Sequence, residues 1–364
     1  MDLQFDEDQQ LLQQTLDRYL EKRLPFDIRR EQESGADFLS FWRELEAELG
    51  IAAAGLPASI GGFGGGSEAE MIVAASLARA LAVTPYIASH VLSANLLEAV
   101  GAAELAQEIA NGDKLLTTAI EEPQTRGEVS LIETRARRTD AGWELHGTKL
   151  VVDFAEQADR ILLPARIDGD EFALFAAIPA MLGAGLKPFH LIDGTPSADI
   201  LLDGARLPED ALVAQGPEVL AALEAAVDRA RAALCAEGSG IAAVMVADTV
   251  AYSKERKQFG VPISSFQALQ HRMVDMWAKA QEIEAAALLA ALKVDQPAAV
   301  SAAKATVSDG LRLIGQEAVQ LHGAMGLTEE LRVGHYFKRA TVLEHKLGSA
   351  SDHVQRYRSL RMAG

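Results

Sequence analysis

The sequence lacks several features whose absence narrows what the protein can be. It has one cysteine, Cys235, in 364 residues, so no disulfide can form within the chain and a thiolate metal site is excluded. A reducing compartment suits such a chain, and we therefore expect a cytoplasmic protein. The eight histidines include no pair at metal-ligand spacing and no HExxH pattern. We predict no metal site.

Positive charge and long apolar runs are also scarce. The chain has 34 Lys and Arg against 52 Asp and Glu, a formal net charge of −18, which argues against nucleic acid as a partner. The longest apolar stretches, such as residues 285–292, fall well short of the roughly 20 residues that span a membrane. Residues 1–8 are acidic and polar, the reverse of a signal peptide. We expect neither a membrane span nor a nucleic-acid site.

What is present divides the chain into three segments with different periodicity. A chain of this length is expected to form two or three packed units. Residues 1–115 carry apolar side chains at helical spacing, as in the run that ends before Pro25, and predict an N-terminal helical domain. Residues 116–215 contain short alternating runs separated by turn residues, and predict a middle antiparallel β-domain. The expected strands lie at 143–152, 160–166, 171–177 and 198–203.

Residues 216–364 return to long, Ala-rich helices. Three of them, at 218–255, 265–293 and 298–323, together with the terminal segment predict a C-terminal four-helix bundle. The predicted fold class is therefore α+β, mainly α, in the order α, β, α.

Two runs in the bundle predict a nucleotide site. In residues 252–267, a basic cluster ends one helix, a Phe-Gly-x-Pro turn follows, and a new helix opens at Ser264-Ser265. This places Arg256 beside backbone donors that suit a pyrophosphate, although a solvated helix–turn–helix corner would have the same pattern. In residues 316–328, Gly323 and Gly326 close a helix, and their lack of side chains lets a nucleotide approach the backbone.

Together these runs resemble the acyl-CoA dehydrogenase family. The pairing is Tyr-x-x-x-Arg-x-x-Phe-Gly with a following Phe-Gln, and then Gln-x-x-Gly-x-x-Gly about fifty residues later. Residues 6–10, 56–64 and 147–151 resemble the family's opening helix, first-domain loop and β-domain. The resemblance implies a helical domain, a β-domain and a four-helix bundle, usually assembled as a dimer of dimers.

The resemblance also implies an activity and its residues. The reaction would be α,β-desaturation of an acyl-CoA thioester, in which a carboxylate takes the α-proton, FAD accepts the β-hydride, and an electron-transferring flavoprotein receives the electrons. The matching positions would hold the FAD diphosphate region (Arg256 and Phe259), add a polar contact (Gln267), meet the adenosine half from a neighbouring protomer (Gln320 and Gly323) and face the acyl-CoA (Arg231).

The carboxylate base stands outside the family pattern. Aligned on the following Gln-Arg, the usual position falls on Ser349, and the alternative position is Ala230. Glu237 lies seven residues after Ala230, on nearly the same helix face about 10 Å away, in a small apolar run that should raise its pKa. We predict Glu237 as the base; a structural acid within the bundle or at a subunit interface is the alternative. Glu344 and Asp352 in the terminal segment are further candidates.

Two segments of the β-domain differ from the family as well. The family's Thr-Glu-Pro-Gly-Ala-Gly-Ser segment, which wraps the flavin, is Glu-Glu-Pro-Gln-Thr-Arg-Gly at residues 121–127, and the segment beside the flavin ring is Val-Val-Asp at 151–153. These differences resemble the branch that acts on bulky or steroid-derived acyl-CoAs. Three hypotheses remain: an active dehydrogenase, a non-catalytic partner subunit of a heteromeric one, and an acyl-CoA oxidase with the same residues.

Overall fold

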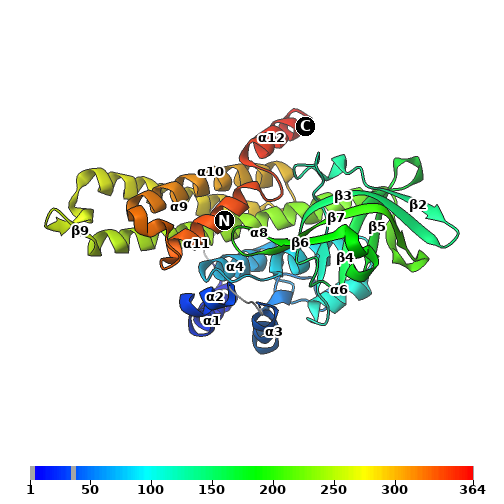
Figure 1. Cartoon of the computed structure of the whole chain (residues 1–364), viewed down its shortest axis with the longest axis horizontal. Coiled ribbons are helices and arrows are strands. Elements are labelled where there is room, and N and C mark those ends of the chain that lie inside the picture. The colour runs from blue at the N-terminus through cyan, green and yellow to red at the C-terminus, as the bar shows by residue number, and fades with distance from the viewer. Residues whose placement is uncertain (1–4, 34–37, 364) are drawn as a thin grey trace. The chain divides into compact units, whose positions relative to one another are not determined.

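The middle of the chain forms an eight-stranded sheet in the computed structural model (Figure 1). The structure describes residues 5–33 and 38–363. The strand order is β6-β7-β3-β2-β4-β5-β8, with β1 paired to β4, and β4 is parallel to β1 and β2 while the other pairs are antiparallel. The strands are β1 (Leu116–Thr118), β2 (Arg135–Thr139), β3 (Gly142–Asp153), β4 (Arg160–Arg166), β5 (Phe172–Ala177), β6 (Leu186–His190), β7 (Pro196–Leu207) and β8 (Leu212–Gln215).

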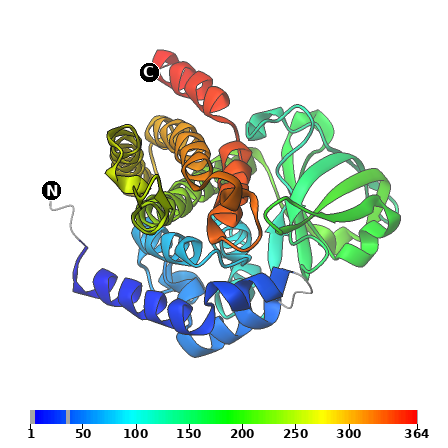
Figure 2. The same ribbon diagram turned by 60° about the vertical axis from the view of Figure 1, so that its left-hand side comes forward.

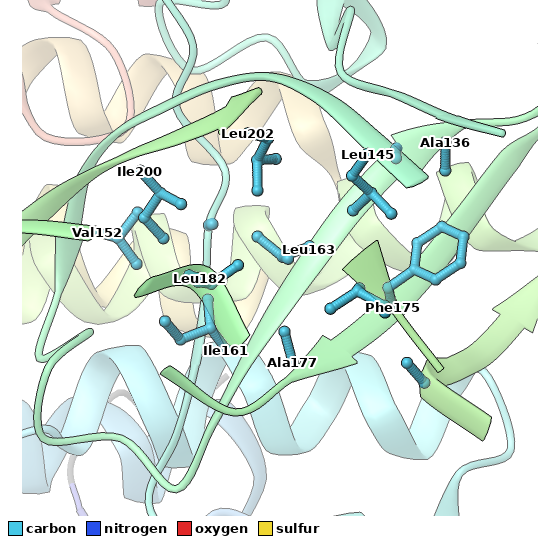
Figure 3. Packing of buried hydrophobic residues seen from close by; sticks show 14 of the residues in the cluster. Ala136, Leu145, Val152, Ile161, Leu163, Phe175, Ala177, Leu182, Ile200 and Leu202 are labelled. Carbon is cyan, nitrogen blue, oxygen red and sulfur yellow. The ribbon is translucent and has the colours of Figure 1, made fainter. Parts of the chain in front are cut away.

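Alternating side chains on these strands build the core of the β-domain. Leu145, Leu163 and Phe175 come from β3, β4 and β5, are fully buried, and meet in one cluster with residues of β7 (Figure 3). Successive side chains of a strand point to opposite faces, so the period of two in the sequence becomes one apolar face. Each of these large side chains contributes about 1.5–3 kcal/mol by its burial.

The N-terminal part is helical, as predicted. Its α-helices are α1 (Glu7–Arg23), α2 (Phe26–Glu33), α3 (Phe38–Leu49), α4 (Gly66–Arg79), α5 (Ala94–Ala99) and α6 (Ala103–Ala110). A capping box between Asp6 and Gln9 opens α1, and the helix ends just before Pro25.

One segment of this part departs from a regular α-helix. The Leu- and Ala-rich run of residues 85–100, whose spacing predicts one helix, is not a single α-helix, because Tyr86–Ser93 forms a π-helical segment before α5 begins. The Ser93 hydroxyl donates to the Ala88 carbonyl at 2.8 Å, and the Asn95 amide donates to the Val91 carbonyl at 2.7 Å. Such side-chain bonds to helix carbonyls compete with the regular ladder.

The C-terminal part consists of long helices, and with it the predicted fold class is confirmed. The helices are α8 (Pro217–Glu255), α9 (Gln267–Leu292), α10 (Pro297–His322), α11 (Arg332–His345) and α12 (Ala350–Ala363); the short helix α7 (Pro179–Leu182) belongs to the β-domain. α10 (orange) packs against α9 (olive), α11 and α12 (red) (Figure 2). Small residues allow close packing, since a Cβ on Gly310 would lie 2.7 Å from the Ile283 side chain.

The chain divides into two compact units, and each is made of separate segments. One comprises Met1–Asp37, Ser67–Ala82 and Arg231–Gly364, and the other Phe38–Gly66 and Val83–Ala230. In the first unit α4 packs with the bundle: the Ser67 hydroxyl donates to the Ala291 carbonyl at 2.7 Å. Gly240 of α8 has no room for a Cβ because the Ala75 carbonyl would lie 2.4 Å away. The N-terminal helices are therefore shared between the two units.

Helix α8 passes from one unit into the other. Among the described residues it is the one helix long and apolar enough to cross a membrane, and 61% of its most apolar stretch is buried within the protein. Burial of this kind is typical of a core helix.

Candidate functional site

Arg256 and Phe259 lie on an exposed hairpin at the end of α8. The strands β9 (Lys257–Gln258) and β10 (Val261–Pro262) pair, and the Ile263 N–H donates to the Arg256 carbonyl at 2.8 Å. Phe259 and Gly260 at the tip both have positive φ, 54° and 83°, as a two-residue hairpin loop of this kind requires. Phe259 is 93% exposed. The predicted turn is therefore present and displays both residues to solvent.

The helix after this hairpin begins differently from the prediction. Ser264-Ser265 does not cap it: Ile263–Ser265 is a 3-10 turn, and the Ser265 hydroxyl donates to the Pro262 carbonyl at 2.7 Å. α9 begins at Gln267, which is exposed. The predicted polar residue thus stands at a helix N-terminus, where backbone N–H groups lack partners within the helix.

Gln320 and Gly323 lie at the end of α10, and Tyr252 joins this end to the hairpin. Gly323 has φ 61° and open space where a Cβ would stand. The ring of Tyr252 stacks on His322 with centroids 4.4 Å apart, and its hydroxyl donates to the His322 carbonyl at 3.3 Å. The Arg256 N–H in turn donates to the Tyr252 carbonyl at 2.8 Å. The structure therefore brings the two predicted nucleotide-binding turns together.

These features fit a dinucleotide. The two turns offer an exposed guanidinium, an exposed aromatic ring, and open space within 4 Å of the Cβ positions of Gly260 and Gly323. A phosphate is bound well by an arginine beside a helix N-terminus. Among the residues that the structure describes, no group of three or more His, Cys, Asp or Glu could hold a metal.

Glu237 does not have the apolar surroundings that the sequence predicted. Its Oε1 accepts a hydrogen bond from Nε of Arg339 at 2.6 Å, and both side chains are largely buried. The other oxygen, Oε2, is buried and has no hydrogen-bond partner in the described part of the chain. The ion pair agrees with the alternative that Glu237 is a structural acid within the bundle. If Glu237 is the catalytic base, Oε2 is the atom that accepts the proton.

Arg231 lies beneath the turn between α11 and α12. It is 3% exposed, and its Nε donates to the Leu347 carbonyl at 3.2 Å. Two further basic residues, which the sequence analysis missed, bind the same turn. Lys304 donates to the Leu343 carbonyl at 2.9 Å and His353 lies 3.0 Å from the Leu347 carbonyl. Contact between Arg231 and a substrate stays a prediction.

This basic cluster is electrostatically unusual. Burial, with repulsion from Arg231, lowers the pKa of Lys304 to about 8. Burial, with repulsion from Arg231 and Lys304, lowers the pKa of His353 to about 2. Burial also raises the pKa of the Cys235 thiol to about 12. The cluster therefore holds a neutral imidazole and an unreactive thiol, and its cations are stabilised by the carbonyls at the end of α11.

Neither family base position, Ser349 at this turn or Ala230 on α8, carries a carboxylate. Ser349 begins α12 as its N-cap: the Asp352 carboxylate accepts the Ser349 N–H at 3.0 Å and the Ser349 hydroxyl at 2.5 Å. Leu347, the residue before Gly348-Ser349, is buried with φ 55°, and Ala230 is fully buried. Asp352 therefore serves as a helix cap. Glu344 is half-buried, and burial raises its pKa.

In the β-domain, one buried ion pair organises the segment that differs from the family. Lys149 of β3 is 0% exposed and donates to Glu122 at 2.7 Å. Glu122 also accepts the Thr134 hydroxyl at 2.6 Å and the Glu133 N–H at 2.7 Å. The neighbouring Glu121 has a buried Oε1 with no partner among the described residues. The sequence signal for this pair is a lysine at an inward position of an alternating strand.

Comparison with known proteins gives a consistent result. Residues 6–112 match the family model "Acyl-CoA dehydrogenase, N-terminal domain", and residues 220–356 match "Acyl-CoA dehydrogenase, C-terminal domain". The chain is 29% identical to acyl-CoA dehydrogenase IpdE2 of Mycolicibacterium smegmatis, over 96% of this chain and 97% of the relative.

Solved structures agree with these matches. The ChsE4-ChsE5 complex of Mycobacterium tuberculosis contains a chain that is 25% identical to this one, with a TM-score of 0.88 and full coverage of both chains. A variant of the steroid acyl-CoA dehydrogenase Tcur3481-Tcur3483 is 27% identical, with a TM-score of 0.87 and 98% of each chain covered.

Proposed function

Because this chain belongs to the acyl-CoA dehydrogenase family, oxidoreductases that act on the CH–CH group of acyl-CoA thioesters, we propose that it takes part in the FAD-dependent α,β-desaturation of a bulky, steroid-derived acyl-CoA. The observation that carries the cofactor proposal is the exposed turn with Arg256 and Phe259, together with the open space at the Cβ positions of Gly260 and Gly323. The proposal of a steroid-derived substrate is supported by one similar solved structure, Tcur3481-Tcur3483, which is named as a steroid acyl-CoA dehydrogenase.

Each cofactor residue would have a defined task. Arg256 would neutralise the FAD diphosphate, and Phe259 would cover it with an apolar face. Gln267 would add a polar contact, and Gln320 and Gly323 would meet the adenosine half of an FAD at an interface between protomers. In the β-domain, segments 121–127 and 151–153 would line the flavin ring. When bound, FAD supplies the hydride acceptor, and an electron-transferring flavoprotein would take up the electrons.

The protein's own contribution to the chemistry would centre on Glu237 and Arg231. Oε2 of Glu237 would accept the α-proton of the thioester, while Arg339 keeps the other oxygen in place. Arg231 would add positive charge on the side that faces the acyl-CoA. We further propose that the protein acts in the cytoplasm as a tetramer, built as a dimer of dimers.

A second function is favoured by a specific observation. Glu237 is bound to a guanidinium, and the family's usual base positions hold Ser349 and Ala230. A chain of this kind would be the non-catalytic subunit of a hetero-oligomer, in which a sister chain brings the base and part of the FAD pocket. The two relatives ChsE4-ChsE5 and Tcur3481-Tcur3483 are themselves named as pairs.

One titration separates these functions. The purified chain is examined by visible absorption, and steroid side-chain CoA thioesters and butyryl-CoA are added anaerobically. A yellow protein that bleaches with a steroid thioester supports the active enzyme. Bleaching that needs a co-expressed sister chain supports the partner subunit, and a chain that stays colourless in both preparations contradicts both. Bleaching followed by hydrogen peroxide release in air identifies an oxidase.

The base is tested by Glu237→Gln. The matched control is Asp248→Asn, because Asp248 is another acid of α8 that pairs with an arginine of α11, Arg332, at 2.6 Å. If Glu237 is the base, its variant keeps the yellow colour and bleaches at least about a hundredfold more slowly, while the control bleaches normally. Equal rates in both variants remove Glu237 from the mechanism.

A further inference from the structure

We propose that Glu122 and Lys149 are positioning residues, which together fix the shapes of segments 121–127 and 151–153 and thereby shape the flavin-ring end of the cofactor site. This inference rests on the proposed function for the identity of the ligand. The coupling of the two segments through one ion pair is a property of the β-domain itself.

The Glu122 carboxylate closes the first segment from within. Oε1 accepts the Lys149 ammonium at 2.7 Å and the Thr134 hydroxyl at 2.6 Å. Oε2 accepts the Glu133 N–H and the Gln124 amide, each at 2.7 Å. The chain leaves Glu122, makes a loop, and returns at Thr134 to the same carboxylate. Hydrogen bonds to this carboxylate therefore close the loop, in place of a regular ladder of backbone hydrogen bonds.

Lys149 connects that loop to the second segment. Its ammonium also donates to the Pro164 carbonyl of β4 at 2.8 Å, which fixes it within the sheet. Directly after Lys149 the pairing of β3 with β7 is interrupted by a bulge, and Val151 has φ 50°. The Leu150 N–H donates to the Glu121 carbonyl at 2.8 Å. A backbone hydrogen bond and an ion pair therefore connect the bulge to the loop.

The far side of the bulge is held by separate contacts. The Val151 N–H donates to the Asp199 carboxylate at 2.9 Å, and the Ser197 hydroxyl donates to Asp153 at 3.1 Å. A non-glycine residue with positive φ is strained and persists only when its surroundings fix it. Lys149 fixes the near side, since it is the last residue of the regular β3 pairing.

The charges of the pair depend on each other. Burial opposes the charge of Glu122, but the Lys149 ammonium and the hydrogen bonds from Lys149, Thr134 and Glu133 outweigh it and lower the pKa of the carboxyl. Burial lowers the pKa of Lys149, and the Glu122 carboxylate opposes that change. Loss of one partner leaves the other charged and buried without its counter-ion, so either single substitution should loosen both segments.

The experiment uses the full-length chain and the variants Lys149→Met, Glu122→Gln and the double variant. The matched control is Arg137→Gln, which removes an exposed ion pair with Glu144 in the same sheet. Hydrogen exchange is measured without FAD on peptides covering residues 121–134 and 148–154, with peptides from β4 and β5 as internal references. FAD affinity and the visible spectrum of the bound flavin are measured on the same samples.

We expect exchange in both segments to rise about tenfold or more in each single variant, with β4 and β5 still protected. FAD affinity should fall by about tenfold, and the visible absorption bands of the bound flavin should broaden. The control should behave as the wild type. If a single variant fails to fold, the double variant, which buries no unpaired charge, takes its place. Wild-type exchange, or wild-type affinity and spectrum in folded variants, overturns the inference. A wild-type chain that binds no FAD, either alone or with a co-expressed sister chain, refutes the proposed function instead, while the exchange data still test the coupling.

Discussion

Replacing Glu46 by glutamine should stabilise the protein at alkaline pH and not at acidic pH. Glu46 lies on α3, and its carboxylate accepts the Ala52 N–H at 3.0 Å. Burial raises its pKa from 4.5 to about 7, although the Ala52 bond acts in the opposite direction. Between these two values the folded state binds more protons than the unfolded state, so stability falls as the pH rises through this window.

The magnitude follows from the size of the shift. A shift of one pKa unit corresponds to about 1.4 kcal/mol, so a rise from 4.5 to about 7 destabilises the fully ionised protein by up to about 3 kcal/mol. Glu46→Gln keeps an acceptor for the Ala52 N–H and carries no charge. We therefore expect a gain of up to about 3 kcal/mol in the free energy of unfolding at pH 8, and almost none at pH 4.5.

Urea unfolding at both pH values measures this gain, and Trp42 on the same helix reports it by fluorescence. Glu48→Gln, a change at an exposed position of α3, is the matched control. An equal effect of Glu46→Gln at both pH values, or a loss of stability at pH 8, would refute the reasoning.

Two further predictions concern the bundle. Arg339→Met leaves the Glu237 carboxylate buried without its cation and should destabilise the protein by about 3 kcal/mol in thermal unfolding, and adding Glu237→Met should recover most of this loss. If the double variant is no more stable than the single one, the ion pair is not the cause. Tyr252→Leu removes the stack on His322 and should weaken FAD binding about three- to tenfold in a fluorescence titration. Tyr252→Phe keeps the stack and should bind FAD almost normally; the opposite order of the two variants contradicts the proposed role of the stack.

The sequence predicted the fold well where one periodicity dominated. The alternating runs at 143–152, 160–166 and 171–177 are β3, β4 and β5, and the Ala-rich runs are α8, α9 and α10. The short strands β1, β2, β6 and β8 were missed, since three to five residues carry too little pattern. The π-helical segment at Tyr86–Ser93 was missed because it depends on side-chain bonds from Ser93 and Asn95, which spacing alone does not show.

The candidate site was predictable only where its residues are close in sequence. The turns at Arg256 and Gly323 were found because hairpin and C-cap chemistry is local. The partner of Glu237 was not found, because Arg339 is 102 residues away in the sequence. It also lies in the terminal segment, where the pattern of charged residues is typical of a solvent-exposed helix face. The pair of Glu122 and Lys149 lies between these cases: a lysine at an inward position of a strand implies a buried anion, although not which one.

The contact between Ser67 and Ala291 has a consequence for how the protein is made. These residues are 224 positions apart, so a ribosome that adds about 5–20 residues per second needs about 11–45 s to synthesise the partner after α4 has emerged. During that time α4, whose apolar side chains Met71, Ile72 and Leu77 are buried in the folded protein, lacks the bundle helices that pack against it. The nascent chain should therefore require a holding chaperone in the cell, and a ribosome stalled before residue 291 should present α4 to proteases.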